Sequence, residues 1–227
     1  QKANEKLVLK DQQKDEFLDT VTHELRTPIT AIRAASEILH DDSEIPEDLK
    51  KQFLQNIISE SDRLNRLIDK ILDLEKFETG KQTINPQKNN LIITIENAIE
   101  PLNQLLKNKH IKILIESKGT FFAYYEEDRI IQVITNLVSN AIKFCPDIEG
   151  IIAIQVHQNN DFLHTTILDN GKGIHPNDFE IIFDKFYQAS NQNFKKPVGS
   201  GLGLAICKQI IEHHKGKIWV NPSSKGA

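Results

Sequence analysis

The sequence predicts an antiparallel helical hairpin followed by an α/β sandwich with a mixed sheet. Two observations lead to this division. The first 78 residues contain no glycine and have long helical periodicity, whereas all ten glycines of the chain fall from Gly80 onward. After Gly80, stretches with helical spacing alternate with short strand-like runs, such as the isoleucines at positions 111, 113 and 115. We therefore expect a boundary near residues 78–82.

The first helix is predicted by apolar residues that recur at alternating spacings of three and four, as in the a and d positions of a heptad. These residues are Leu18, Val21, Leu25, Pro28, Ile32, Ala35 and Leu39. We expect residues 1–16 to continue this helix upstream as a signal-input helix or coiled-coil linker, although the polar run 10–16 is atypical of a coiled-coil seam.

The second helix carries a less regular apolar stripe, because Glu60 and Ser61 fall where the stripe should continue. Its residues are Phe53, Ile57, Leu64, Leu67, Ile71 and Leu74. Between the two stripes, Pro46 can occupy a first helical position, and the acidic residues that follow it complement the helix dipole. A two-helix hairpin cannot bury both apolar faces alone, so we expect residues 17–78 to form a homodimeric four-helix bundle.

The remaining residues, 79–227, are expected to form the sandwich. Spacing predicts helices over 91–106, 130–144 and 202–214, and strands over 111–115, 121–125, 151–156, 162–168 and 217–220. The polar residues 158–161 separate two of these strands and are typical of a hairpin turn.

Composition excludes several functional classes. Hydrophobic residues make up 39% and charged residues 26% of the 227, as is ordinary for a globular protein. The 28 basic and 32 acidic residues give a net charge of −4, so we expect neither nucleic acid nor direct membrane contact. Cys145 and Cys207 lack disulfide or metal-site spacing, which favours a reducing, cytoplasmic location. No apolar run approaches the roughly 20 residues that span a bilayer, and the lack of methionine indicates an excised fragment or processed product.

His23 begins the run His-Glu-Leu-Arg-Thr-Pro and falls at heptad position f, which points to solvent. A separate active site can therefore reach its nucleophilic nitrogen. Glu24 can accept a hydrogen bond from the other ring nitrogen and raise the nucleophilicity of His23, and Thr27 shares its helical face. The alternative is an ordinary solvated histidine. Pro28 argues against it, because a proline in a helix interior costs about 3 kcal/mol and needs a further justification.

Asn136, Asn140 and Lys143 lie along one face of the predicted helix 130–144. An amide oxygen can join the coordination shell of Mg²⁺, which retains waters and phosphate oxygens as its other ligands. Lys143 can then offset phosphate charge. An amphipathic helix with an exposed polar stripe is the alternative interpretation of this helix alone.

Two further stretches carry glycines. The run Asp169-Asn-Gly-Lys-Gly-Ile174 ends a strand at a point where a carboxylate can accept from an exocyclic amine, but it is also a common turn. The run Gly199-Ser-Gly-Leu-Gly203 precedes a helix, where backbone N–H groups and the helix dipole bind phosphate. The polar segment 188–198 before it is typical either of a lid or of a structural linker.

Taken together and in this order, the motifs resemble those of the sensor histidine kinases of two-component systems, over essentially the full chain. His23–Pro28 matches the H box, Asn136–Phe144 the N box and Asp169–Gly173 the D box. Residues 182–187 match the F box, and residues 199–204 match the last glycine box. The resemblance implies an ATPase sandwich of the gyrase and histidine-kinase type, with an upstream sensor domain that this fragment lacks and a full-length protein compatible with a membrane anchor.

The resemblance also implies residue roles. His23 would take the γ-phosphoryl group of ATP with Glu24 and Thr27 beside it, Asn140 would bind Mg²⁺, and Asp169 would contact adenine. Lys143 and the backbone of 201–203 would hold phosphates. The remaining nucleotide-site residues would be Asn136, Phe144, Gly171, Gly173, Ile174, Phe183, Phe186, Tyr187, Gly199, Gly201, Leu202, Gly203 and Leu204.

Two positions depart from the family pattern. Gln188 stands where many relatives carry an arginine, and His214-Lys215-Gly216 replaces a common His-Gly-Gly turn. If the arginine steadies the γ-phosphate, the neutral glutamine slows the reaction. We expect the second departure to be structural.

The expected function is ATP-dependent autophosphorylation of His23, followed by transfer to an aspartate of a response-regulator receiver domain. Phosphatase activity toward that aspartate is an additional expectation for Thr27. Two alternatives stay open. A gyrase-like conformational ATPase would have no use for His23 on a dimeric hairpin, and intact Asn140, Asp169 and Gly203 count against a catalytically dead signalling scaffold.

Overall fold

The structure is a computed structural model. It describes the backbone of residues 2–41, 45–80, 83–117, 119–146, 148–187 and 200–221, with the side chains of these residues except 2–14, 16 and 78. The predicted lid or linker at 188–198, Gln188 and Gly199 lie outside the described residues.

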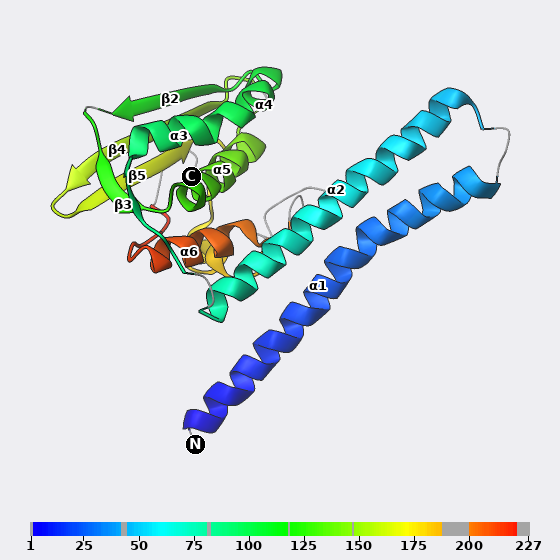
Figure 1. The fold of residues 1–227 in the computed structure, drawn as a ribbon, viewed down its shortest axis with the longest axis horizontal. Helices are drawn as coiled ribbons and strands as arrows, with labels where there is room; N and C mark the ends of the chain where they lie inside the picture. Colours follow the sequence, from blue (N-terminus) through cyan, green and yellow to red (C-terminus); the bar gives the residue numbers. More distant parts are fainter. Residues whose placement is uncertain are drawn as a thin grey trace.

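Two long helices form the predicted hairpin, α1 (Lys2–Asp41) and α2 (Glu47–Glu78), which lie side by side in Figure 1. The upstream residues from Lys2 are helical and continuous with the rest of α1. Pro46 precedes α2 as its N-cap and does not occupy its first turn, with φ −54° and ψ 139°. This backbone angle is extended, so the helix begins one residue later than the sequence suggested.

The apolar stripe of α1 faces α2 over most of its length. Pro28 is fully buried, and Ala35 is 6% exposed. Leu18 is 49% exposed, so the predicted core position at the start of the stripe is only half covered in the single chain. Glu60 and Ser61, which interrupt the stripe of α2, are both half-buried and therefore lie on its inner side.

The sandwich, defined here as residues 83–221, packs helices against a mixed sheet. Its helical elements are α3 (Leu91–Ile99), η1 (Glu100–Leu102), α4 (Asn103–Asn108), α5 (Glu127–Phe144), η2 (Pro176–Asp178), η3 (Ile181–Phe183) and α6 (Gly203–His213). Its strands are β1 (Gln87–Asn90), β2 (Lys112–Ser117), β3 (Phe122–Tyr125), β4 (Ile151–Asn159) and β5 (Phe162–Asp169).

The main sheet has the order β2-β4-β5, with β2 parallel and β5 antiparallel to β4. The predicted mixed sheet and the predicted β4–β5 hairpin are thus confirmed. Asn160 turns this hairpin with φ 51°, a left-handed conformation that asparagine tolerates. A second sheet, which the sequence did not reveal, pairs β1 with β3.

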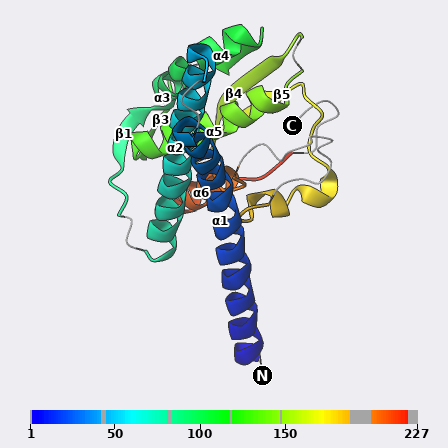
Figure 2. The same ribbon diagram turned by 90° about the vertical axis from the view of Figure 1, so that its right-hand side faces the viewer.

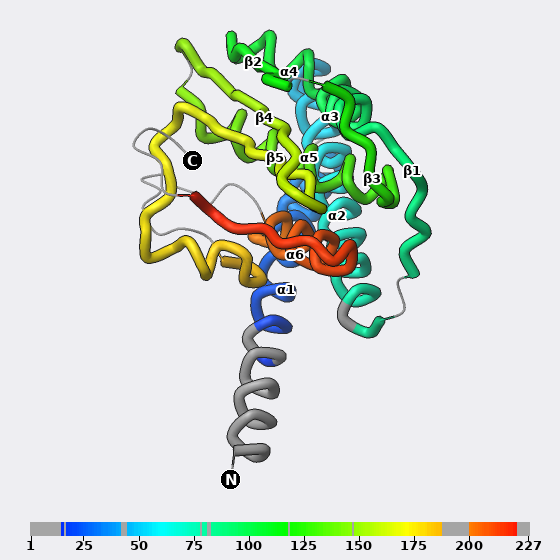
Figure 3. The backbone as a smooth tube through the Cα atoms, turned by 90° about the vertical axis from the view of Figure 1, so that its left-hand side faces the viewer, coloured from blue at the N-terminus to red at the C-terminus, as the bar shows by residue number. Residues whose placement is uncertain are grey.

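Two predicted elements are wrong. The helix expected over 91–106 is divided into α3, η1 and α4, because Pro101 cannot donate the hydrogen bond that a continuous helix requires. Residues 217–220 form no strand in the described part of the chain. Trp219 contacts His164 of β5 with ring centroids 6.2 Å apart, but without strand pairing. Figure 3 shows this segment in red, beyond α6.

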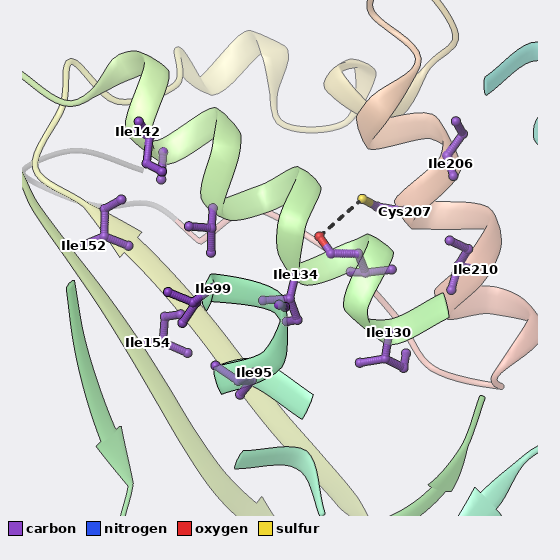
Figure 4. Close-up of a cluster of buried hydrophobic side chains, with 14 of the residues drawn as sticks. Ile95, Ile99, Ile130, Ile134, Ile142, Ile152, Ile154, Ile206, Cys207 and Ile210 are labelled. Carbon is purple, nitrogen blue, oxygen red and sulfur yellow. Dashed lines mark hydrogen bonds between the residues drawn. The ribbon is translucent and has the colours of Figure 1, made fainter. Parts of the chain in front are cut away.

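The core lies between the sheet and the helices (Figure 4). Ile95 and Ile99 from α3, Ile134 and Ile142 from α5, and Ile152 and Ile154 from β4 contribute to it. On the other side of α5, Ile206 and Ile210 from α6 extend the same cluster. Cys207 lies here too, fully buried, and its thiol donates to the carbonyl oxygen of Val133 at 3.8 Å.

The C-terminal half of α2 packs against the sandwich, where Figures 1 and 2 place it beside α6. Leu67, Leu74 and Phe77 of α2 are 7%, 1% and 2% exposed and belong to the sandwich core. The hairpin and the sandwich therefore share apolar contacts along this half of α2. Among the described residues, no helix is long and apolar enough to cross a membrane.

Candidate nucleotide and phosphoacceptor sites

A cavity of about 1710 Å³ opens between α5, β5 and the start of α6. Most of the residues predicted for the nucleotide site line it, although they come from segments up to 68 positions apart. These are Asn136, Asn140, Lys143, Phe144, Asp169, Gly173, Ile174, Phe183, Tyr187, Gly201, Gly203 and Leu204. The fold thus brings the polar face of α5, the end of β5 and the glycine-rich run into one place.

Three predicted site residues do not line this cavity. Leu202 is fully buried in the core, so it supports the glycine-rich run from behind. Phe186 packs instead against Phe17 of α1, with ring centroids 5.3 Å apart. Gly171 lies in the turn after β5, where a Cβ would stand 2.5 Å from the carbonyl oxygen of Phe144. Gly171 is therefore required for close backbone packing.

The polar face of α5 forms one wall of the cavity. Asn136, Asn140 and Lys143 lie on it at spacings of four and three, while Val133 and Val138 of the same helix are buried. Burial lowers the pKa of the Lys143 ammonium, and the nearby positive charge of Lys70 lowers it further. A half-buried ammonium of this kind is stabilised by an anion.

Asp169 is the last residue of β5. Its Oδ1 accepts the backbone N–H of Gly171 at 2.7 Å, which fixes the orientation of the carboxylate at the cavity wall. The neighbouring Asn170 ties the turn to the preceding loop, because its Oδ1 accepts from the backbone N–H of Ile151 and its Nδ2 donates to the carbonyl oxygen of Glu149, both at 2.8 Å. Asn170 therefore holds the turn from outside the cavity.

The F-box segment and the glycine-rich run are joined directly. The backbone N–H of Phe186 donates to the carbonyl oxygen of Gly201 at 3.0 Å. Gly201 has φ 66°, and a Cβ there would lie 2.5 Å from the backbone of Phe186, so only glycine fits. The hydroxyl of Tyr187 donates to Oδ1 of buried Asp178 at 2.8 Å. This arrangement sets the path of the backbone into α6.

His23 lies on the exposed surface of α1, as its heptad position predicted. Within the described part of the chain, no hydrogen bond joins His23 to Glu24, which is half-buried. Thr27 is exposed, and its hydroxyl donates to the backbone carbonyl oxygen of His23 at 3.3 Å. None of the three lines the cavity. The phosphoacceptor candidate and the nucleotide candidate are thus separate sites on two parts of the chain.

Lys70 of α2 also lines the cavity, although no motif of the sequence predicted it there. Lys70 comes three residues after Leu67 and four before Leu74, both of which are buried. The available signal was a lysine at core spacing within an apolar stripe.

His214, which also lines the cavity, has the expected structural role. Its Nε2 accepts the backbone N–H of Glu126 at 3.1 Å, so its Nδ1 carries the proton that it donates to the carbonyl oxygen of Ile210 at 2.8 Å.

Two protein-family models match different parts of the chain. Residues 13–80 match the His Kinase A (phospho-acceptor) domain, and residues 125–227 match the family of histidine kinase-, DNA gyrase B-, and HSP90-like ATPases. The chain is also 31% identical over 213 residues to the sensor histidine kinase WalK of Bacillus subtilis (strain 168). The chain belongs to the sensor histidine kinases. The phosphoacceptor match distinguishes this kinase from a gyrase-like ATPase.

The relatives of this histidine kinase are longer proteins. The B. subtilis match covers 93% of the kinase chain and 35% of that WalK. A Staphylococcus aureus sensor protein kinase WalK is 34% identical over 213 residues, which cover 93% of the chain and 51% of that relative. The chain therefore spans about a third to a half of the curated relatives it matches.

Solved structures share the fold of the kinase over most of its length. The Acinetobacter baumannii histidine kinase AdeS superimposes with a TM-score of 0.74 at 24% identity, covering 90% of this chain and 93% of that one. The histidine kinase ThkA, solved in complex with the response regulator protein TrrA, has a TM-score of 0.73 at 26% identity and covers 97% of this chain and 63% of that one. The helical hairpin followed by an α/β ATPase sandwich is thus confirmed.

Proposed function

We propose that the chain binds ATP in the cavity, transfers its γ-phosphoryl group to His23, and passes that group to an aspartate of a response-regulator receiver domain. The observation that carries the proposal is the convergence of an adenine-type carboxylate, Asp169, a glycine-rich helix start and the cation Lys143 on one cavity. The exposed His23 on the hairpin supplies the acceptor. These residue roles, and the division into domains at 1–16, 17–78 and 79–227, belong to the proposal.

The donor set of the cavity suits magnesium. Asn136 and Asn140 present neutral amide oxygens, and a Cβ at Gly203 would lie 3.5 Å from Oδ1 of Asn136, so the amide stands against the glycine-rich run. A hard ion that retains its waters needs only one or two such ligands. Bound Mg²⁺ would neutralise phosphate charge. Asn140 would ligate it, and Lys143 would hold the phosphates with the N-terminal backbone of α6.

The phosphoryl transfer is a displacement at the γ-phosphorus. The lone pair of a His23 ring nitrogen forms the new N–P bond as the bond from the γ-phosphorus to the β,γ-bridging oxygen breaks, and ADP leaves with that electron pair. Glu24, which forms no hydrogen bond with His23 in the structure, rotates toward the other ring nitrogen and accepts its proton. Because His23 lies outside the cavity, the reaction requires the sandwich to approach the exposed face of α1 of the same chain or of a second chain.

The second half-reaction requires a receiver domain that reaches the same exposed histidine. Its aspartate oxygen attacks the phosphorus as the N–P bond breaks, and the imidazole leaves with that electron pair. The ring takes up the proton that Glu24 accepted in the first half-reaction, which regenerates neutral His23. The ThkA structure in complex with TrrA supports this partner class. We also propose a homodimer through the hairpin and a cytoplasmic location, where ATP is available and the two buried thiols remain reduced.

Labelling with γ-labelled ATP tests the proposal. His23→Gln should abolish labelling and leave ATP affinity within about twofold, because His23 does not line the cavity. The label on the wild type should be lost in acid and survive in base. Equal labelling of the variant, or acid-stable label, would contradict the proposal.

Asn140→Asp should reduce the magnesium-dependent rate, since the added charge repels the triphosphate and alters the hydration of the ion. The rate is measured across a magnesium titration. An unchanged titration curve would remove Asn140 from the metal site.

A further inference from the structure

Lys70 lies on α2, a helix of the hairpin, yet its side chain lines the nucleotide cavity of the sandwich. The same cavity is lined by Asn136, Lys143 and Gly203, the residues assigned above to magnesium and phosphate. Helix α2 contacts α6, and α6 in turn packs against α5. The lysine therefore stands at the phosphate end of the cavity, where α5 and α6 meet.

A polar clamp one turn further along α2 joins this helix to α5. Oδ2 of Asp73 accepts from Nη1 of Arg129 at 3.1 Å and from Nε2 of Gln132 at 3.0 Å, and both donors belong to α5. The Arg129 guanidinium also lies 5.4 Å from the ring centroid of Phe77. Because residues 70 and 73 share one helical face, the clamp directs the Lys70 side chain toward α5.

The surroundings of Lys70 are rich in positive charge. Burial lowers its pKa, and the neighbouring Arg66 lowers it further, while Lys70 in turn lowers the pKa of Lys143. In the described part of the chain, neither lysine forms a salt bridge with a carboxylate. Two half-buried ammonium groups on one cavity are mutually repulsive, and a polyanion between them removes the repulsion.

We propose that Lys70 is a polyphosphate-binding residue of the nucleotide site, supplied by the phosphotransfer hairpin to the catalytic sandwich. The inference rests on the proposed ATP function and adds a residue that no motif of the sandwich contains. Bound triphosphate then links α2 to α5 and α6, so ATP strengthens the contact between the two parts of the chain. A nucleotide without phosphates cannot use this contact.

Calorimetric titration of the whole chain with ATP, ADP and adenosine tests the inference. Lys70→Met keeps the aliphatic stem and removes the charge, Lys70→Arg keeps the charge, and Lys51→Met is a matched control. Lys51 is an exposed lysine of α2, about 28 Å from Lys70 along the helix axis. The Lys70→Met variant should bind ATP about tenfold more weakly, the magnitude of one charge-assisted contact. Its affinity for adenosine should not change, and Lys70→Arg and Lys51→Met should match the wild type.

Thermal melting adds a measurement without nucleotide. Lys70→Met should melt no lower than the wild type, because the repulsion is removed, but should gain less stability from ATP. Unchanged ATP affinity of Lys70→Met, or an equal loss for adenosine, would overturn the inference and leave the proposed function standing.

Titration with inorganic tripolyphosphate distinguishes a failure of this inference from a failure of the ATP proposal. If the wild type binds tripolyphosphate but no adenosine, the ATP proposal fails while weaker tripolyphosphate binding by Lys70→Met still supports this site. If the wild type does not bind tripolyphosphate, the inference fails.

Discussion

The hydroxyl of Thr27 is committed to the helix backbone, since it donates to the carbonyl oxygen of His23 at 3.3 Å. Pro28 follows it and has no N–H, so the carbonyl oxygen of Glu24 lacks its usual helical donor. Two roles are therefore distinguishable. Thr27 can hold the backbone beside the proline, or it can rotate its hydroxyl to orient water at the phosphorylated receiver domain.

Thr27→Ala should retain autophosphorylation of His23 and lose most phosphatase activity toward the phosphorylated receiver, about tenfold or more. Thr27→Ser, which keeps a hydroxyl, should recover phosphatase activity. Rates of label loss from the receiver and of label gain on the kinase measure the two activities. A parallel fall of both in Thr27→Ala would show that the hydroxyl supports the proline-containing helix instead.

The buried thiol of Cys207 should make the free energy of unfolding fall at alkaline pH. Burial raises the pKa of its thiol from 9.0 to about 12. The unfolded chain therefore releases this proton at lower pH than the folded chain. The contribution of the thiol is fully present below about pH 9 and is lost as pH rises through the window from 9.0 to about 12.

At pH 10 this loss amounts to about 1 kcal/mol in the free energy of unfolding. Urea unfolding of the wild type and Cys207→Ala between pH 7.5 and 10 measures it. The variant carries a constant packing deficit, so only the difference in slope reports the thiol. Parallel curves would show that the thiol is ionised at similar pH in both states.

The role of a single residue could be predicted from the sequence where neighbouring residues of the same element determine it. The exposure of His23 follows from its heptad position, and it was confirmed. Lys70 has core spacing on α2, but its place at the cavity depends on contacts between α2 and the sandwich, which that spacing does not specify. Gly171 carries a third kind of constraint. It was assigned to the nucleotide site, but the structure places it in backbone contact with Phe144, a packing requirement that resembles a binding motif in sequence.

At the scale of elements, hydrogen bonds to Asp73 join α2 to α5. Its carboxylate accepts from Arg129 and Gln132, and the side chains of Asp73 and Arg129 are only 22% and 19% exposed. Asp73→Ala removes the acceptor of the Gln132 Nε2 and one of the two acceptors of the Arg129 Nη1, which also donates to Oε1 of Gln132 at 2.9 Å. The loss should cost about 1–3 kcal/mol of unfolding free energy. Urea unfolding measures the loss.

Asp69→Ala is the matched control for this prediction, because Asp69 is an exposed aspartate of the same helix. It should change stability little, as surface charges generally do. The interpretation would be wrong if both aspartates contributed equally, since the cost would then come from helix charge and not from the clamp.

Helices and strands were predicted well where their own residue pattern determines them. They were predicted poorly where pairing with another segment determines them. The periods of α1, α2 and α5 were sufficient for these helices, because each buries a continuous stripe. Pro101 has no backbone N–H to donate, which predicts a break in the helix over 91–106. The continuous apolar spacing of these residues obscured that signal. Strand β1 carries the polar residues Gln87–Asn90 and is a strand only because β3 pairs with it. Residues 217–220 show the opposite case, because they have the composition of a strand but pair with no other strand in the described part of the chain.

Over the whole molecule, the hairpin leaves large apolar side chains uncovered. Among the side chains of α1 and α2 that the structure describes, those at least 39% exposed are Leu18, Ile29, Ile38, Leu49, Leu54, Ile58, Ile68 and Leu72. A single exposed leucine needs no explanation, but a row of them along two helices is typical of an interface. The core of α1 and α2 in one chain buries only their facing sides.

A second copy of the hairpin is the partner that fits this row. Ile58 is 54% exposed, and in a symmetric four-helix bundle the two copies of each residue contribute together. Ile58→Asp replaces two apolar contacts by two charges. At about 1.5–3 kcal/mol for each buried side chain, the dimer dissociation constant should rise at least 100-fold. Analytical ultracentrifugation should therefore find the wild type at twice the chain mass and Ile58→Asp at the chain mass under the same conditions. Ile148→Asp is the control, because Ile148 is 80% exposed on the sandwich and outside the row. If both variants remain dimers, or if the wild type sediments as a monomer, the uncovered row does not mediate self-association.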